Sequence, residues 1–435
     1  MSNLEKVKNS VDFLKVESNK NEYSLIRCGK NVYNYKKHQL NEVSHSPTVD
    51  YFLIPKNSYN SLPFGNSQFY IDFDLPKIQY SIYEFVLRFT MNLTQAASGA
   101  QCPIIPYPLI IDRISVLKNS NALGNDTYDW DILLYNLNKY YNDLLNYDIT
   151  NQLGVGTNSL EVNGKLFFGS VITNGSAGYN ISLPISLNYS SFPLDLIQND
   201  ITLRIYFKSN VLENTDLFKD NMVQLSNVGL VLRVNELSND ARKHICCQPK
   251  LNHLFNKRIF TKINVNSLTA GQNYQIVIPG FRQVASSVLI FFSSSDNAIT
   301  NAQNNGYYWH TWRFGINNVY ITDSAGRNIL NNNKYDQNYN RYLISNHFNN
   351  LNNVFNSNTN SQKNSLGELT YIPFCNEESD SFNGAFSGGM PFKDTGDYSI
   401  NFTSNHTCSN VILTLMWFVP SILSLHNGDL TETYA

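Results

Sequence analysis

The sequence is poor in charged residues and in cysteine for a chain of 435 residues. Charged residues make up 15% of it, well below the roughly 25% of an average soluble protein. Lysine and arginine number 32 against 34 aspartates and glutamates, which leaves a formal net charge of -2. This balance excludes a polycation that coats nucleic acid, so any such contact is local. The six cysteines lack the density of a secreted disulfide scaffold, and we expect a reducing compartment.

Long apolar segments are also missing. Residues 1–20 mix charged with apolar residues and contain no apolar core of a secretory signal. The longest apolar run, Val411 to Leu425, contains Thr414 and Pro420 and is shorter than the ~20 residues that a membrane-spanning helix needs. We interpret this run as a buried strand and its exit.

The sequence contains none of the common catalytic motifs. A phosphate-binding loop, a zinc-protease helix, a hydrolase nucleophile elbow and a dinucleotide-binding glycine pattern are all missing. We therefore predict that the protein is not an enzyme and binds no cofactor.

Aromatic residues are abundant, at 13%, with 27 tyrosines and 26 phenylalanines. They alternate with mostly polar residues, most clearly at Tyr83, Phe85, Leu87, Phe89 and Met91. Alternation of this kind indicates antiparallel strands with one buried face. Similar short segments recur along both halves of the chain, which predicts an all-β protein of sandwiches or barrels.

Two segments have helical spacing instead. Apolar residues recur every three or four positions from Trp130 to Leu144, behind Asp129 as a candidate N-cap, which predicts a helical insertion in the first half. A shorter stripe at the N-terminus predicts a helical arm: Leu4, Val7, Val11 and Leu14.

The N-terminal arm is basic. Residues 1–40 hold eight lysines and arginines against four acidic residues, and the arm's first basic residues are Lys6, Lys8, Lys15, Lys20 and Arg27. A basic amphipathic arm suits a membrane surface or packaged nucleic acid. A solvated helix that docks on its own protein explains the same pattern.

A weak repeat relates the two halves. The segment from Phe69 resembles the segment from Tyr274, at an offset of 205 residues (274 − 69). Three further pairs follow in the same order at nearly the same offset: Phe85 with Val288, Ile114 with Val319, and Ile201 with Val411. We interpret this order as one β domain written twice. The predicted parts are an arm (1–49), a first sandwich (50–235), a linker (236–256), a second sandwich (257–425) and a tail (426–435).

Three clusters of side chains are candidate sites. The best metal candidate is a set of soft ligands in the linker: His244, Cys246, Cys247 and His253. Adjacent cysteines do not fit two tetrahedral positions easily, so we expect no metal site. Asp72 and Asp74 share a strand face, as an acid/base pair would, and a solvated strand face is the simpler interpretation. The aromatic residues between Tyr307 and Phe314 suit a sugar platform, although alternating burial explains half of them.

Two motifs within this layout resemble the double jelly-roll major capsid proteins of adenoviruses, tailless membrane-containing phages, nucleocytoplasmic large DNA viruses, virophages and polinton-like elements. One is Leu183-Pro184-Ile185 at the start of the segment that runs to Phe207, and the other is the C-terminal segment from Leu415 to Ala435. The resemblance implies two tandem jelly-roll β-sandwiches, with the helical insertion in the first sandwich. No stretch identifies a particular virus.

The resemblance also implies a function. Two sandwiches per chain make a homotrimer pseudo-hexagonal, so that it tiles an icosahedral viral shell. The implied partners are the protein itself, neighbouring capsomers, penton and minor capsid proteins, and an internal membrane or the genome beneath the N-terminal arm. The implied location is the virion, assembled inside the host cell. The loop 331–364 would form an outward tower or the trimer seam.

Two other functions stay open. The first is a carbohydrate- or receptor-binding β-sandwich of the fibre or lectin type, and the second is a glycan-active enzyme on a jelly-roll scaffold. The repeat separates the first from a capsomer, because a capsomer needs two equivalent units and a lectin with an added domain does not. The second would need two carboxylates about 5 to 10 Å apart in a cleft.

Overall fold

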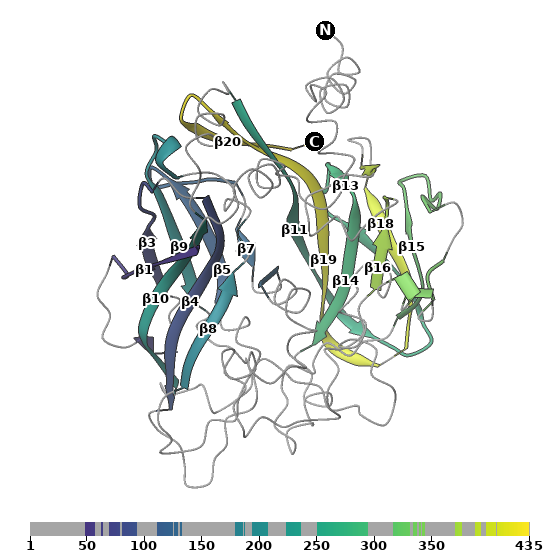
Figure 1. Ribbon diagram of the computed structural model, residues 1–435. Helices are drawn as coiled ribbons and strands as arrows, with labels where there is room; N and C mark the ends of the chain where they lie inside the picture. The colour runs from purple at the N-terminus through teal and green to yellow at the C-terminus, as the bar shows by residue number, and fades with distance from the viewer. Residues whose placement is uncertain are drawn as a thin grey trace.

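The computed structural model of the chain shows two β-sandwiches side by side (Figure 1). The residues that it describes are 48–56, 62–63, 69–78, 81–93, 111–124, 126–128, 131–132, 179–185, 187, 194–207, 223–235, 250–294, 316–330, 334–336, 339–340, 342–343, 370–375, 388–392, 397–405 and 407–434. Every strand pair within these ranges is antiparallel. The prediction of an all-β fold is confirmed.

The N-terminal half forms the first sandwich. Its strands are β1 (Thr48–Leu53), β2 (Leu62–Pro63), β3 (Phe69–Asp74), β4 (Ser81–Leu93), β5 (Ile111–Lys118), β6 (Asn121–Ala122), β7 (Thr127–Tyr128), β8 (Tyr179–Ile185), β9 (Ile201–Phe207) and β10 (Val223–Asn235). A short 3-10 helix, η2 (Leu194–Leu196), precedes β9. One sheet has the order β1-β10-β4-β8, and β2 also pairs with β10. The facing sheet has the order β3-β9-β5-β6, and β7 also pairs with β5.

The C-terminal half forms the second sandwich. Its strands are β11 (Lys250–Leu268), β12 (Asn273–Ile278), β13 (Val284–Ala285), β14 (Ser287–Ser294), β15 (Ile316–Thr322), β16 (Thr370–Pro373), β17 (Met390–Pro391), β18 (Tyr398–Ser404), β19 (Cys408–His426) and β20 (Asp429–Tyr434). The larger sheet has the order β11-β19-β14-β16, and β20 also pairs with β19. The smaller sheet has the order β12-β18-β15, and β13 pairs with β17 separately.

The two sandwiches repeat one topology. The order β1-β10-β4-β8 of the first returns as β11-β19-β14-β16 in the second, and β3-β9-β5 returns as β12-β18-β15. Two facing antiparallel sheets in which consecutive strands alternate between the sheets are a jelly roll. The chain therefore has the predicted architecture of two tandem jelly rolls.

The repeat predicted from the sequence is correct at three of its four anchors. Those three join β3 with β12, β4 with β14, and β5 with β15. The pairing of Ile201 with Val411 is wrong, because Ile201 lies in β9 and Val411 in β19. The counterpart of β9 is β18, and that of β19 is β10. Apolar alternation marks a strand with one buried face but does not say to which sheet it belongs.

Several expected segments lie partly or wholly outside the described residues. The helical insertion is represented only by Asp131 and Ile132, which are helical, and the N-terminal arm is not described up to residue 47. Strand β11 occupies residues 250–256 of the expected linker, because it pairs with β19 along nearly its whole length. Strand β20 occupies most of the expected tail, where it pairs with the end of β19.

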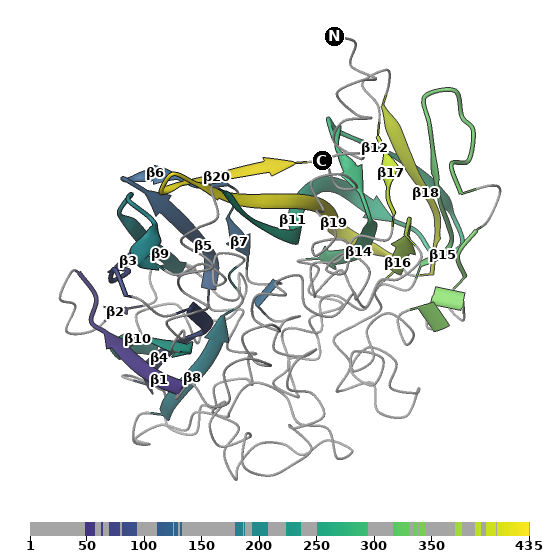
Figure 2. The same cartoon turned by 45° about the horizontal axis from the view of Figure 1, so that its top comes forward.

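Burial explains where the alternation holds and where it stops. In β9 the alternate residues from Ile201 to Phe207 are buried and those between them are half-buried, as in a strand with one face in a core. In β19 every residue from Leu413 to Ser421 is buried. One face of β19 lines its own sandwich, and the other is turned toward the first sandwich (Figures 1 and 2). Both faces of this stretch are therefore buried, and the predicted buried strand is confirmed.

Candidate functional site: the contact between the two sandwiches

The hairpin that joins β19 to β20 reaches the first sandwich. Asn427 and Gly428 have φ values of 50° and 80° and form a two-residue turn between the paired residues His426 and Asp429. Asn-Gly suits such a turn because both positions need a left-handed backbone. The amide N–H of Gln198 donates to the carbonyl oxygen of Gly428 at 2.8 Å. The tip of the hairpin is therefore tied to the loop that follows η2.

Asp429 holds the same hairpin to two more residues of the first sandwich. Its Oδ1 accepts hydrogen bonds from Lys118 Nζ and from Asn199 Nδ2, both at 3.0 Å. Lys118 also donates to the carbonyl oxygen of Leu430 at 3.0 Å. Each bond lies near solvent and contributes little alone, but together they fix the hairpin against the end of β5.

Gly428→Ala should destabilise the protein by about 1–2 kcal/mol, because a side chain at positive φ is strained and an added Cβ would overlap the Gln198 side chain. Urea unfolding would measure the change. Gly271→Ala is the matched control, since Gly271 has a φ of 78° with nothing within 4 Å of an added Cβ. An equal loss in both variants would show that the contact between the hairpin and Gln198 contributes nothing to stability.

A buried ion pair forms the second part of the contact. Arg258 of β11 places its Nε 3.1 Å from Oδ1 of Asp131, and the two side chains are only 6% and 3% exposed. Beside them the ring of Phe260 lies 4.9 Å from the ring of Tyr128 in β7. Burial at this place raises the pKa of the Tyr128 hydroxyl, and the nearby Asp126 carboxylate adds to the effect. A charged pair and an aromatic pair thus join β11 to the first sandwich.

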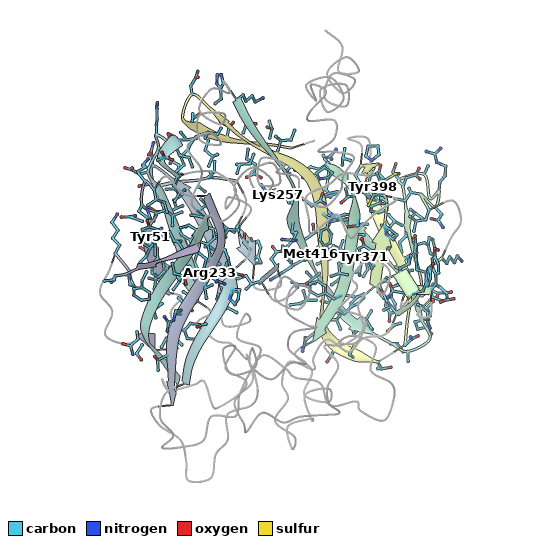
Figure 3. The ribbon with its side chains drawn as sticks, viewed as in Figure 1. Tyr51, Arg233, Lys257, Tyr371, Tyr398 and Met416 are labelled. Carbon is cyan, nitrogen blue, oxygen red and sulfur yellow. The ribbon has the colours of Figure 1, made fainter. Side chains whose placement is uncertain are left out.

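A second buried pair stiffens the strands that carry the contact. Lys257 of β11 forms an ion pair with Glu432 of β20, and both side chains are almost fully buried. Lys257 lies on the stretch of β11 between the two sandwiches (Figure 3). Because β11 and β20 flank β19 on opposite edges, this pair clamps the central strand of the contact.

Asp72 and Asp74 do not form an acid/base pair. Asp72 is buried and accepts two bonds from Arg204, at 2.7 and 2.8 Å. Asp74 accepts a hydrogen bond from Thr202 at 2.7 Å and pairs with Lys56 at 3.0 Å. Each carboxylate therefore has its own cation, and the two tie β3 to β9. The simpler interpretation, a solvated face, is right for Asp74 and wrong for Asp72, whose charge is neutralised by Arg204.

The Asp74 carboxyl has a pKa below its ordinary value of 3.8, first because the Thr202 hydroxyl donates to it and then because of Lys56. A depressed pKa contributes stability above the unfolded-state pKa, and that stability is lost as the pH falls through the folded-state pKa. We expect Thr202→Val to raise the pKa of Asp74 toward 3.8, as measured by carbon NMR titration. A pKa that stays unchanged in this variant would contradict the assigned cause.

The remaining candidates from the sequence lie outside the described residues. This holds for the arm residues Lys6, Lys8, Lys15, Lys20 and Arg27, and for the aromatic residues between 307 and 314. In the metal candidate, His253 lies in β11, while His244, Cys246 and Cys247 are not described. The described part of the chain holds no group of three or more His, Cys, Asp or Glu residues placed to bind a metal. In that same part no helix is long and apolar enough to cross a membrane.

The buried contact was missed from the sequence, although part of its signal was present. Asn427-Gly428 followed by residues of alternating character is a short-range hairpin signal. Arg258 and Asp131 had no such signal, because the pairing of residues so far apart depends on how the sandwiches meet.

Two jelly rolls of one topology, joined by a buried contact, place the chain in the double jelly-roll class of proteins. No protein-family model matches the sequence, and no curated protein matches it either. Solved structures do match. VP54 of PBCV-1, fitted into a reconstruction of the virophage Sputnik, has a TM-score of 0.61 at 12% identity, over 90% of this chain and 98% of that one.

Two further solved structures share the fold. The Faustovirus major capsid protein has a TM-score of 0.54 at 9% identity, over 88% of this chain and 91% of that one. The mavirus major capsid protein has a TM-score of 0.53 at 11% identity, over 92% of this chain and 94% of that one. The likeness spans nearly the whole chain in each case. It confirms the double jelly-roll fold and the structural resemblance to major capsid proteins that the sequence suggested.

Proposed function

We propose that the protein is a non-enzymatic major capsid protein that assembles as a pseudo-hexagonal homotrimer and tiles an icosahedral viral shell. The observation that carries this proposal is the pair of topologically equivalent jelly rolls held together by a buried contact within one chain. The likeness to major capsid proteins over nearly the full chain supports it.

The geometry of the contact supports a trimer. Within the chain, β11 and the β19–β20 hairpin of the second sandwich meet β5, β7 and the loop after η2 in the first. This contact joins different surfaces of two similar units, so it is heterologous. A heterologous contact that repeats between chains closes into a ring when the rotation allows it. Three chains then supply six similar sandwiches around one axis.

The finer parts of the proposal concern segments outside the described ranges. We propose a basic arm over residues 1–49 that faces the interior, with Lys6, Lys8, Lys15, Lys20 and Arg27 toward a membrane or the genome. We also propose a helical insertion over residues 130–144, and jelly rolls over about residues 50–235 and 257–425. The partners would be neighbouring capsomers, penton proteins and minor capsid proteins, in virions assembled inside the host cell.

Light scattering coupled to size-exclusion chromatography tests the proposal. We expect purified protein to have about three times the chain mass of 49.6 kDa and to appear as hexagonal outlines in negative-stain micrographs. A monodisperse monomer at micromolar concentration would contradict the capsomer and favour the carbohydrate- or receptor-binding alternative.

A further inference from the structure

Two equivalent rows of paired residues cross the sheets β1-β10-β4-β8 and β11-β19-β14-β16, one row in each sandwich. Row 1, in the first sandwich, consists of Phe52, Val231, Val86 and Pro184. Row 2, in the second sandwich, consists of Phe260, Met416, Leu289 and Tyr371. The rows are equivalent because Val86 directly follows the repeat anchor Phe85 in β4, and Leu289 directly follows the matching anchor Val288 in β14. Both rows are apolar throughout.

Row 2 is covered within the chain. Met416, Leu289 and Tyr371 are almost completely buried, and Figure 3 labels Met416 and Tyr371 on the sheet that lies nearer the first sandwich. At the end of the row, Phe260 packs against Tyr128 of the first sandwich. The first sandwich therefore closes row 2 at its Phe260 end.

Row 1 ends in an exposed aromatic ring. Phe52, the counterpart of Phe260, is 57% exposed, and Ile54 just beyond it is 76% exposed. Their neighbours Tyr51 and Leu53 pack against the core, so Phe52 is on the outer face of its sheet. The Phe52 ring lies over Gly229, where an added Cβ would overlap it. Exposed apolar side chains at the end of an apolar row mark an interaction site.

The surface that closes row 2 has its own counterpart in the second sandwich. Thr127 of β7 pairs with Ile114 of β5. Val319 of β15, the repeat counterpart of Ile114, bridges to Tyr335. Tyr335 is therefore the counterpart of Thr127 in the first sandwich. Thr127 is the neighbour of Tyr128, the residue that contacts Phe260.

This counterpart is a stack of three tyrosines, of which Tyr335 is buried and the other two are exposed. The ring of Tyr339 lies 5.4 Å from that of Tyr335 and 6.2 Å from that of Tyr342. Tyr339 and Tyr342 are 48% and 58% exposed. Like Asp131 in the first sandwich, Tyr339 is helical and follows the bridging residue at the same distance along the chain.

We propose that Phe52 and Ile54 of one chain bind the exposed rings of Tyr339 and Tyr342, which stack on the buried Tyr335, in a second copy of this chain. The inference rests on the proposed function and specifies the surface that closes the trimer. Phe260 and Tyr128 contact each other within one chain. The proposed contact is its equivalent between two chains. The two surfaces together contain four of the large apolar side chains that the described residues expose, as expected of the aromatic anchors of an interface.

The charges of the two surfaces are also compatible. Asp50, which pairs with Arg233 across the sheet, is the counterpart of Arg258, and Tyr339 is the counterpart of Asp131. A carboxylate facing Asp50 would be repelled, but a phenol can donate a hydrogen bond to it. The tyrosine at position 339 therefore suits the acidic residue at position 50 of the neighbouring chain.

Phe52→Lys tests the surface, with Val277→Lys as its matched control. Val277 is 52% exposed on β12 and belongs to neither surface. We expect Phe52→Lys to weaken trimerisation at least tenfold, the effect of losing a buried aromatic anchor, and Val277→Lys to leave it unchanged. Far-UV circular dichroism of both variants should match the wild type, because both side chains are exposed. A folded Phe52→Lys protein that trimerises like the wild type would overturn the inference but not the capsomer.

A mixing experiment tests the heterologous geometry. At a concentration at which Phe52→Lys and Tyr339→Lys are each monomeric alone, an equimolar mixture should form a dimer of two chain masses but no trimer. One intact Phe52 then meets one intact tyrosine stack, and the ring cannot close. A mixture that stays monomeric would overturn the inferred pairing. A wild-type protein that is itself monomeric would overturn the proposed function together with this surface.

Discussion

Arg258→Met is expected to lower the free energy of unfolding by about 3–5 kcal/mol, because removing one member of a buried ion pair leaves a charge in a medium of low dielectric constant. The guanidinium Nε lies 3.1 Å from Asp131, and both side chains are buried between the sandwiches. The Asp131 carboxylate would keep its burial and lose this cation. Urea unfolding monitored by tryptophan fluorescence would measure the loss.

The double variant Arg258→Met, Asp131→Leu is the control for this prediction. An apolar pair of similar volume in place of a buried ion pair is often neutral or stabilising, so the second substitution should restore most of the lost stability. A single variant that loses less than about 1 kcal/mol, the range of an exposed pair, would show that the pair is not buried in solution. Trimerisation should fall in the single variant as well, because the angle between the sandwiches depends on this contact.

The sequence predicted the strands better than it predicted their assembly. Alternation located β4 and β9, and the apolar run from Val411 located β19, since burial of one or both faces leaves a direct trace in the order of residues. The match of Ile201 with Val411 failed because two alternating strands look alike whichever sheet they join. Strand β20 lies in the segment predicted as a tail, and it has little signal of its own because its pairing depends on the end of β19.

The contact between the sandwiches could not be predicted from the sequence, for a different reason. Lys118 and Asp429 are separated by 311 positions in the chain, and nothing near either residue distinguishes it from an ordinary surface charge. The spacing of Asp72 and Asp74 places them on one strand face, but the partner Arg204 follows only from the pairing of β3 with β9. Local patterns report the burial of a face, whereas ion pairs across strands and domains depend on topology.

Trp417→Ala should have a cost of similar size, about 3–5 kcal/mol, which is typical of removing a buried tryptophan. Trp417 is fully buried in the second sandwich. Its ring stacks on Phe281 at 4.1 Å and meets the edge of Phe392 at 5.0 Å, and its Nε1 donates to Thr261 at 3.2 Å. Trp417→Phe is the milder control, because it keeps an aromatic ring in the stack and loses only volume and one hydrogen bond. Equal losses in the two variants would contradict a cavity as the cause.

Hydrogen exchange of Trp417→Ala would then report how firmly the two sandwiches are coupled. Trp417 lies on β19, which pairs with β11 on one side and with β14 on the other. Since β11 carries Arg258 and Phe260 to the first sandwich, loosening the second core should also lower the protection of β5 and β7. Protection of β4 and β8, which lie in the other sheet of the first sandwich, should change little. Loss confined to the second sandwich would mean that the two jelly rolls unfold independently, and that the buried pair aligns them without joining their cores.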